Sequence, residues 1–193
     1  WIEFDQNNLG MRTNEDIIYL ANELKQLLEH GQLNQIGFSG NNFNDEKIFL
    51  LFDGLVTAPI LCFDGNSLGD LVHCKEETLV NNFGKLKGLT SLSIINTELY
   101  KLGDKAQFVF EGLATTNITG LEMGSNELEK LGEHAALFFR SLKQLKLEHL
   151  DISDNSFDMF KEDVATAVFE ALGKSERLES LTCSDIGLHN FGK

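Results

Sequence analysis

The sequence predicts an α/β solenoid, a right-handed horseshoe in which each repeated unit adds a strand to a parallel concave sheet and a helix to the convex side. Three observations support this fold class. The apolar pattern L-x-x-L-x-L-x-x-N-x-L recurs along the 193 residues, residues inside it alternate as in a strand, and the intervening segments have helical periodicity. Because stacked units bury their apolar faces against one another, we expect one domain over residues 1–193.

The repeats are irregular but continuous. Three copies of the pattern are nearly complete, at Leu33/Ile36/Phe38/Asn41/Phe43, Ile118/Leu121/Met123/Asn126/Leu128 and Leu147/Leu150/Ile152/Asn155/Phe157. Anchoring every copy on its asparagine position gives about seven units, 25 to 34 residues apart, at Asn7, Asn41, Asn66, Thr97, Asn126, Asn155 and Ile186.

Each unit begins with a short predicted strand. Its apolar residues alternate with polar ones, so that one face points into the core. Examples of these apolar pairs are Ile2 and Phe4, Leu61 and Phe63, Leu92 and Ile94, and Leu150 and Ile152. The strands must be parallel, because each returns in the same direction through a crossover of a dozen or more residues.

The crossovers are predicted to be helices. Apolar residues fall three to four positions apart in them, which places one stripe against the strands. Such stripes are Leu102/Ala106/Phe110/Leu113, Leu131/Ala135/Phe138/Leu142 and Phe160/Val164/Val168/Leu172. We expect Asn14 and Asp158 to act near helix starts, where unpaired amide groups favour such side chains.

The recurring asparagine has a structural explanation. Where the chain leaves a strand and turns into the core, backbone groups lose their sheet partners, and a buried amide side chain can both donate to them and accept from them. We therefore expect a structural asparagine ladder along the stack, formed by Asn7, Asn41, Asn66, Asn126 and Asn155. Thr97 can supply part of this bonding, whereas Ile186 cannot.

The units resemble leucine-rich repeats of the ribonuclease-inhibitor-like subclass, because steps near 29 residues leave room for a full helix. The resemblance covers essentially the whole chain and implies a horseshoe whose curved surface binds another macromolecule. In its type of repeat, though not in any signature motif, the chain resembles the repeat regions of intracellular-pathogen effectors and of cytosolic innate-immune or inhibitor proteins. Irregular repeats rich in Asn, Lys and Phe favour the effectors.

The charge balance limits the partners. Sixteen basic and thirty acidic residues give a formal net charge of −14. Such a chain is unsuited to a nucleic-acid backbone or an anionic membrane surface, and it suits a basic protein partner. The alternative interpretation is that the acidity only keeps an elongated protein in solution.

The strand positions between the apolar residues point outward onto the concave face and therefore define the candidate binding surface. In these columns there is no lysine or arginine. The candidate partner-binding residues are Glu3, Asp5, Asp64, Glu122, His149, Asp151, Asp154 and Asp185. They form either an acidic groove that attracts a basic partner or a charged face that opposes aggregation.

The sequence offers no catalytic or metal-binding motif. Its five histidines lack metal-ligand spacing, and nucleotide-binding and nucleophile-elbow motifs are missing, so we expect no enzyme activity, no cofactor and no metal. One enzyme-related alternative remains. Some ribonuclease-inhibitor-like repeat proteins resemble this chain in repeat length and acidity and activate small GTPases; they carry an arginine in an early loop, which corresponds to Arg12 here.

The cellular context follows from a few features. Cys62, Cys74 and Cys183 are odd in number and lack a C-x-x-C spacing, which favours reduced thiols. No apolar run is long enough to insert into a membrane, so we expect a cytoplasmic protein, or an effector delivered into a host cytoplasm. Because neither end resembles a capping unit, we also expect a fragment of a longer chain that lacks both caps.

The leading hypothesis is a protein-binding module, with an adaptor or effector-targeting role, that holds a basic partner on its acidic concave face. A second hypothesis is an inhibitor that plugs a basic enzyme. A GTPase-activating protein that uses Arg12 and a structural spacer between other domains are further alternatives.

Overall fold

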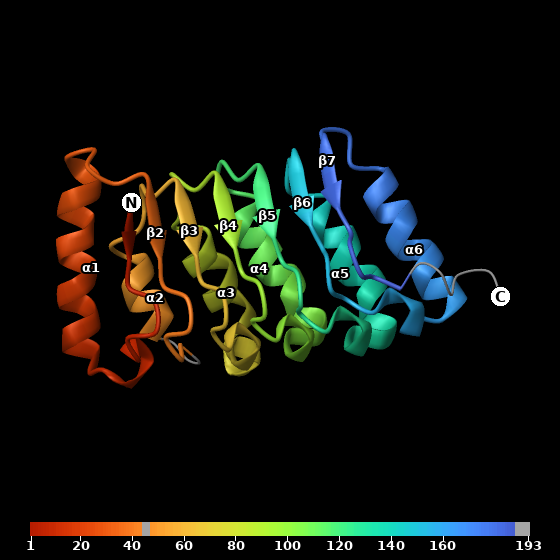
Figure 1. Cartoon of the computed structure of the whole chain (residues 1–193), viewed down its shortest axis with the longest axis horizontal. Coiled ribbons are helices and arrows are strands. Elements are labelled where there is room, and N and C mark those ends of the chain that lie inside the picture. Colours follow the sequence, from red (N-terminus) through yellow and green to blue (C-terminus); the bar gives the residue numbers. More distant parts are fainter. Residues whose placement is uncertain (44–46, 188–193) are drawn as a thin grey trace.

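The sheet confirms the predicted α/β class. In the computed structural model, which describes residues 1–43 and 47–187, a parallel seven-stranded sheet runs in chain order. Its strands are β1 (Ile2–Glu3), β2 (Gln35–Gly37), β3 (Ile60–Cys62), β4 (Ser91–Ser93), β5 (Gly120–Glu122), β6 (His149–Asp151) and β7 (Ser180–Thr182). Each strand pairs with the strand of the next repeat, so the chain advances by one step per repeat (Figure 1).

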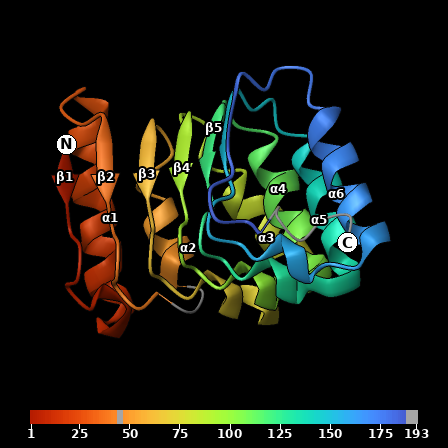
Figure 2. The same cartoon turned by 45° about the vertical axis from the view of Figure 1, so that its right-hand side comes forward.

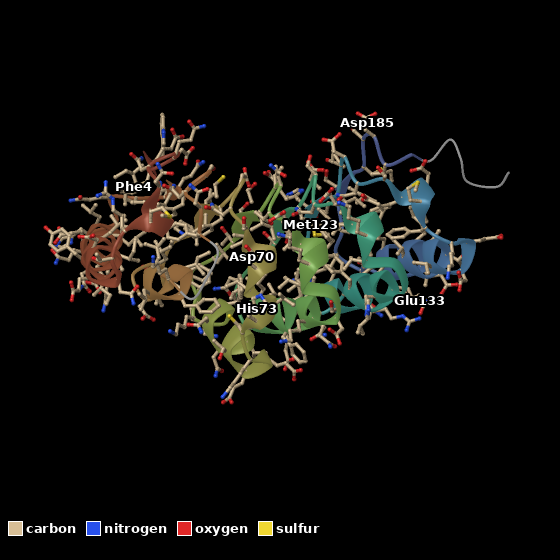
Figure 3. All side chains as sticks on the ribbon, turned by 90° about the horizontal axis from the view of Figure 1, so that it is seen from below. Phe4, Asp70, His73, Met123, Glu133 and Asp185 are labelled. Carbon is tan, nitrogen blue, oxygen red and sulfur yellow. The ribbon has the colours of Figure 1, made fainter. Side chains whose placement is uncertain are left out.

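The helices form a second layer on one side of the sheet (Figure 2). They are α1 (Asn14–Glu29), α2 (Lys47–Phe52), α3 (Glu76–Phe83), α4 (Ala106–Leu113), α5 (Ala135–Leu142) and α6 (Glu162–Gly173). Viewed along the strands, the two layers follow a shallow arc with the sheet on the inner side, and Glu133 lies on the outer side (Figure 3). The helix layer is therefore convex, as the sequence predicts.

Register stacks equivalent residues directly above one another. Ile36, Leu61, Leu92, Leu121 and Leu150 are paired from strand to strand, and all five are buried. They form the central row of the core between the two layers. Because each row repeats the same apolar position, burial of one unit requires the next.

The first repeats add an aromatic stack to this core. The rings of Phe4 and Phe38 are 5.5 Å apart and those of Phe38 and Phe63 are 5.3 Å apart, with interplanar angles of 11° and 15°. Pairing in register places these rings over one another, and such contacts add about 1 kcal/mol beyond simple burial.

The crossovers differ from the predicted continuous helices. Short 3-10 segments precede most of the α-helices: Leu9–Met11, Leu68–His73, Leu99–Lys105, Leu128–His134 and Phe157–Met159. Leu102 and Leu131 lie in these segments and are buried as predicted. Gly103 and Gly132, with φ near 55° and ψ near −125°, then break the chain direction before α4 and α5. This region of backbone space is open essentially to glycine alone, so the predicted apolar stripe spans two elements.

Asn14 and Asp158 lie near helix starts as predicted, but neither caps an α-helix. The N-cap of α1 is Thr13, not Asn14, and it forms a capping box in which its hydroxyl accepts from the Asp16 amide at 3.2 Å. Asp158 lies in the Phe157–Met159 segment, whereas α6 follows Lys161. Thr13 satisfies an amide that Asn14, already inside the helix, cannot reach.

Side-chain amides connect the repeats where the chain leaves each strand. The Oδ1 atom of Asn126 accepts from the amides of Thr97 (2.8 Å) and Leu99 (3.2 Å) in the preceding repeat. Its Nδ2 atom donates to the carbonyls of Ile94 and Met123, at 2.8 and 3.0 Å. One buried side chain therefore satisfies backbone groups of two consecutive repeats.

The same bonding recurs along the stack. Asn41, Asn66 and Asn155 are also buried, and each donates and accepts as Asn126 does. Thr97 supplies the donor half, since its hydroxyl donates to the Ile94 carbonyl at 2.9 Å. Asn7 makes two such donations from an exposed position in the first repeat.

We predict that Asn126→Ala lowers the free energy of unfolding by about 3 kcal/mol, because it leaves several buried amides and carbonyls without partners. Asn7→Ala is the matched control: it removes the same side chain from an exposed rung and should cost less than about 1 kcal/mol. Urea denaturation followed by circular dichroism measures both. Equal losses for the two variants would show that burial of the amide is not what matters.

Candidate protein-binding surface

The strand register separates two groups of predicted site residues. The first group is Glu3 and Asp5 at β1, and the second is Glu122, His149 and Asp151 on β5 and β6. The outward positions after the central apolar row are Glu3, Gly37, Cys62, Ser93, Glu122, Asp151 and Thr182, in order across the sheet. Glu122 and Asp151 are direct neighbours, with strands about 4.8 Å apart. Glu3 is separated from them by three positions without charge. The acids therefore do not form one continuous stripe.

The second group lines a groove of about 330 Å³ on the concave face over β4 to β7. Gly120, which has no side chain, lies between Ser91 and His149 in the register and leaves the floor of the groove low. The groove is lined by Thr90, Ser91, Thr119, Gly120, Leu121, Glu122, His149, Leu150, Asp151, Ser180 and Thr182. Three predicted site residues, Glu122, His149 and Asp151, thus share one hollow.

The groove carries negative charge that the protein does not neutralise. No lysine or arginine is among the residues that line it. The exposed carboxylate of Glu122 has no hydrogen-bond partner within the described part of the chain. Asp151 uses Oδ1 to accept from the Ser153 amide at 2.8 Å, which leaves its other oxygen available. A cationic group placed between these two carboxylates would form charge-assisted hydrogen bonds.

The first group has a partly structural role. The Oδ1 atom of Asp5 accepts from the Ser39 amide of the next repeat at 2.8 Å. A Cβ atom added at Gly37 would lie 3.1 Å from that oxygen and 3.3 Å from Cγ of Glu3. Both acidic side chains therefore fold over the glycine, and Glu3 is the more available of the two.

Both carboxylate oxygens of Asp64 accept hydrogen bonds from residues of the sheet and the turn that follows it. Its Oδ1 atom accepts from the Ile95 amide at 2.8 Å and from the Ser93 hydroxyl at 2.7 Å, and Oδ2 accepts from the Cys62 thiol at 3.1 Å. With both oxygens occupied, Asp64 links the third and fourth repeats. This side chain has little capacity left for a partner.

Asp154 and Asp185 lie at the turn that follows the strand. Both are exposed and adopt left-handed backbone conformations, with φ of 56° and 52°. Gly40 and Gly65 occupy the equivalent turn position in two other repeats, also with positive φ. Asp tolerates this conformation better than most residues, so the turn alone explains these acids. Asp185 lies at the end of one arm of the arc (Figure 3) and is not among the residues that line the groove.

The sequence did not single out the threonines at the groove wall. Thr90 and Thr119 immediately precede the predicted strands, where the apolar pattern gives no information about side-chain direction. Their only sequence signal is that two threonines occupy equivalent positions of neighbouring repeats, one residue before Ser91 and Gly120.

Arg12 lies far from this groove along the sheet. It follows the first 3-10 segment, is exposed, and lines a hollow of about 380 Å³ with Phe4, Tyr19 and Leu20. Within residues 1–43 and 47–187, no cluster of three or more His, Cys, Asp or Glu side chains could hold a metal ion. No helix in the same residues is long and apolar enough to cross a bilayer.

The pKa of the Cys62 thiol depends on the negative charge of the neighbouring Asp64 carboxylate. Burial raises the pKa of Cys62, and the adjacent Asp64 carboxylate raises this pKa further, against opposing hydrogen bonds from Ser39 and the Asp64 backbone. At about pH 8 we predict slower alkylation of Cys62 by iodoacetamide than of a cysteine in a short peptide, because the thiolate reacts. Asp64→Asn removes the negative charge, lowers the pKa of Cys62 and should speed the reaction several-fold.

Peptide mapping by mass spectrometry would follow each cysteine separately. Glu122→Gln, which removes an equal charge elsewhere on the face, is the control and should leave the Cys62 rate unchanged. If Asp64→Asn left the rate unchanged as well, the thiol and the carboxylate would not interact.

Comparisons with known proteins identify the fold. No family model matches the sequence, and curated proteins give no match. Among solved structures, the chain is similar to the leucine-rich repeat-containing protein LegL7 from Legionella pneumophila, with a TM-score of 0.72 and 17% identity over 98% of this chain. The tropomodulin C-terminal domain from Caenorhabditis elegans matches at a TM-score of 0.49 and 14% identity, over 85% of this chain and 93% of that domain. This chain spans 57% of the length of the LegL7 chain. The similarity to LegL7 confirms the predicted leucine-rich repeat solenoid.

Proposed function

We propose that this chain, which has the leucine-rich repeat fold, is a protein-binding module that holds a basic segment of its partner in the groove over β4 to β7. The observation that carries the proposal is the pair of neighbouring carboxylates, Glu122 and Asp151, which no lysine or arginine of the groove neutralises. Repeat folds of this shape have extended concave surfaces suited to binding.

The physical argument rests on like charges held side by side. Parallel pairing fixes Glu122 and Asp151 at neighbouring positions of adjacent strands, which are about 4.8 Å apart, so two negative charges face the groove together. A lysine or arginine between them would form charge-assisted hydrogen bonds. His149 and the surrounding hydroxyls add polar contacts around such a side chain. A net charge of −14 supports the choice of a basic protein over a nucleic acid.

Such a module would serve as an adaptor or a targeting domain in the cytoplasm, or in a host cytoplasm if the protein is an effector. The similarity to a Legionella protein is in keeping with the second setting. Arg12 lies in the first repeat, outside the proposed site, so GTPase activation is not part of this proposal. An inhibitor that plugs a basic enzyme would bury far more than the roughly 1,600 Å² of a standard interface, whereas a groove for one segment would bury less.

We predict that the double variant Glu122→Gln/Asp151→Asn loses its partner. Each charged hydrogen bond contributes about 1.5–3 kcal/mol, so removing both charges should weaken binding at least about tenfold. Affinity capture from lysate at low and high salt, with bound proteins identified by mass spectrometry, provides the measurement. The partner should be basic and should also be released by high salt.

A charge-matched control separates the groove from the overall acidity. Glu23→Gln/Glu111→Gln removes two exposed acids from the helix layer, in α1 and α4, with the same change in net charge. This variant should capture the same partner as the unmodified chain. Equal loss from both variants would show that the groove has no special role, and equal capture by both would place the site elsewhere.

A further inference from the structure

A second hollow lies beside the acidic groove, at the edge of the molecule where helices end and strands begin. It has a volume of about 270 Å³ and is lined by residues of the segments that join α4 to β5, α5 to β6 and α6 to β7. These connections lie at the upper edge of the molecule in Figure 1. Two basic side chains line it, Lys146 and Arg177, which occupy equivalent positions of successive repeats. In an acidic protein this is a local reversal of charge.

Neither basic side chain has a partner within the described part of the chain. No ion pair or hydrogen bond involves the Lys146 ammonium or the Arg177 guanidinium, although Glu148, Glu176 and Glu179 belong to the same loops. By contrast, Lys174 in the same region pairs with Glu170 at 3.4 Å. The two cations at the hollow are thus available to an external group.

The helix dipole does not explain these two residues. A cation stabilises a helix only near its last turn, and the effect falls off quickly beyond it. The helices α5 and α6 end at Leu142 and Gly173, four residues before Lys146 and Arg177. Arg140 and Lys143 occupy the favourable positions instead. The positions of Lys146 and Arg177 fit the hollow better than they fit the helix ends.

Two other polar side chains of the hollow, Thr116 and Asn117, already donate hydrogen bonds within the protein. The Thr116 hydroxyl donates to the Leu113 carbonyl at 2.6 Å and accepts from the Ile118 amide at 3.3 Å. The side-chain amide of Asn117 donates through Nδ2 to the Lys87 carbonyl at 2.9 Å. The charged groups that line this hollow are therefore two cationic donors, which favour an anionic ligand.

The hollow and the acidic groove meet at Thr119, which lines both. Lys146 precedes Asp151 by five residues, and this stretch, which contains a bend at Glu148 before β6, spans at most about 16 Å at 3.3 Å per residue. A peptide lying along this strand would cover the same distance with about five residues. One partner segment can therefore reach both sites.

We propose that the segment bound in the groove carries an acidic residue about five positions from its basic residue, and that Lys146 and Arg177 bind this carboxylate. The proposal rests on the proposed function for the basic half of the segment. It adds a second, oppositely charged contact that sets the orientation and spacing of the bound segment.

Nuclear magnetic resonance titration of the labelled chain tests this at low salt with blocked peptides. One peptide carries arginines, one carries aspartates, and a third joins both through a short serine-threonine spacer. The aspartate peptide should shift the amide signals of residues 117–119 together with Lys146 and Arg177. The joined peptide should bind about tenfold tighter than the arginine peptide, because the second contact becomes intramolecular.

Variants give the control. Lys146→Gln/Arg177→Gln should abolish the shifts caused by the aspartate peptide and reduce the joined peptide to the affinity of the arginine peptide. Arg140→Gln/Lys143→Gln makes the same change in charge at the end of α5, outside the hollow, and should behave like the unmodified chain. The spectra also show whether each variant is folded.

Two results would overturn the inference: no shift at residues 117–119 with the aspartate peptide, or identical shifts in the Lys146→Gln/Arg177→Gln variant. Failure of the proposed function has a different signature. In that case the arginine peptide would leave the signals of Gly120–Glu122 and His149–Asp151 unmoved, whatever happens at the basic hollow.

Discussion

The structure depends on how the backbone is satisfied where it leaves each strand. At that point the amides and carbonyls no longer have sheet partners, and they are buried between two layers. A single asparagine side chain, as at Asn126, bonds to both the preceding repeat and its own. Because these bonds have fixed geometry, each repeat is placed in register on the last. The apolar rows and the phenylalanine stack follow from that register.

Register also decides which acidic side chains remain available. An outward position on one strand is beside the same position on the next, so a carboxylate can either bond to the neighbouring repeat or face solvent. Asp64 bonds to the neighbouring repeat and so links two repeats, whereas Glu122 faces the solvent in the groove. Asp154 and Asp185 serve the turn conformation. The function we propose therefore uses Glu122, whose carboxylate makes no hydrogen bond within the described residues, and Asp151, whose carboxylate bonds to the Ser153 amide through one oxygen only.

The sequence was sufficient for the parallel strands, the helix layer and the stacking order, because each rests on a period that repeats about seven times. It was insufficient where one residue changes a local choice. Gly103 and Gly132 divide two of the three predicted helical stripes, and Thr13 is the N-cap expected of Asn14. The commitment of Asp64 and the hollow at Lys146 and Arg177 depend on neighbours some thirty residues away, whose alignment only the register supplies.

Native-state hydrogen exchange is the most direct test of the central claim, that buried asparagines hold the repeats in register. The amides of Thr97, Leu99 and Leu128 donate to asparagine side chains of the following repeat. The account predicts that they exchange as slowly as amides inside the sheet, although they lie outside the strands. Exchange as fast as in the exposed turns would contradict it, because the ladder would then be open in solution.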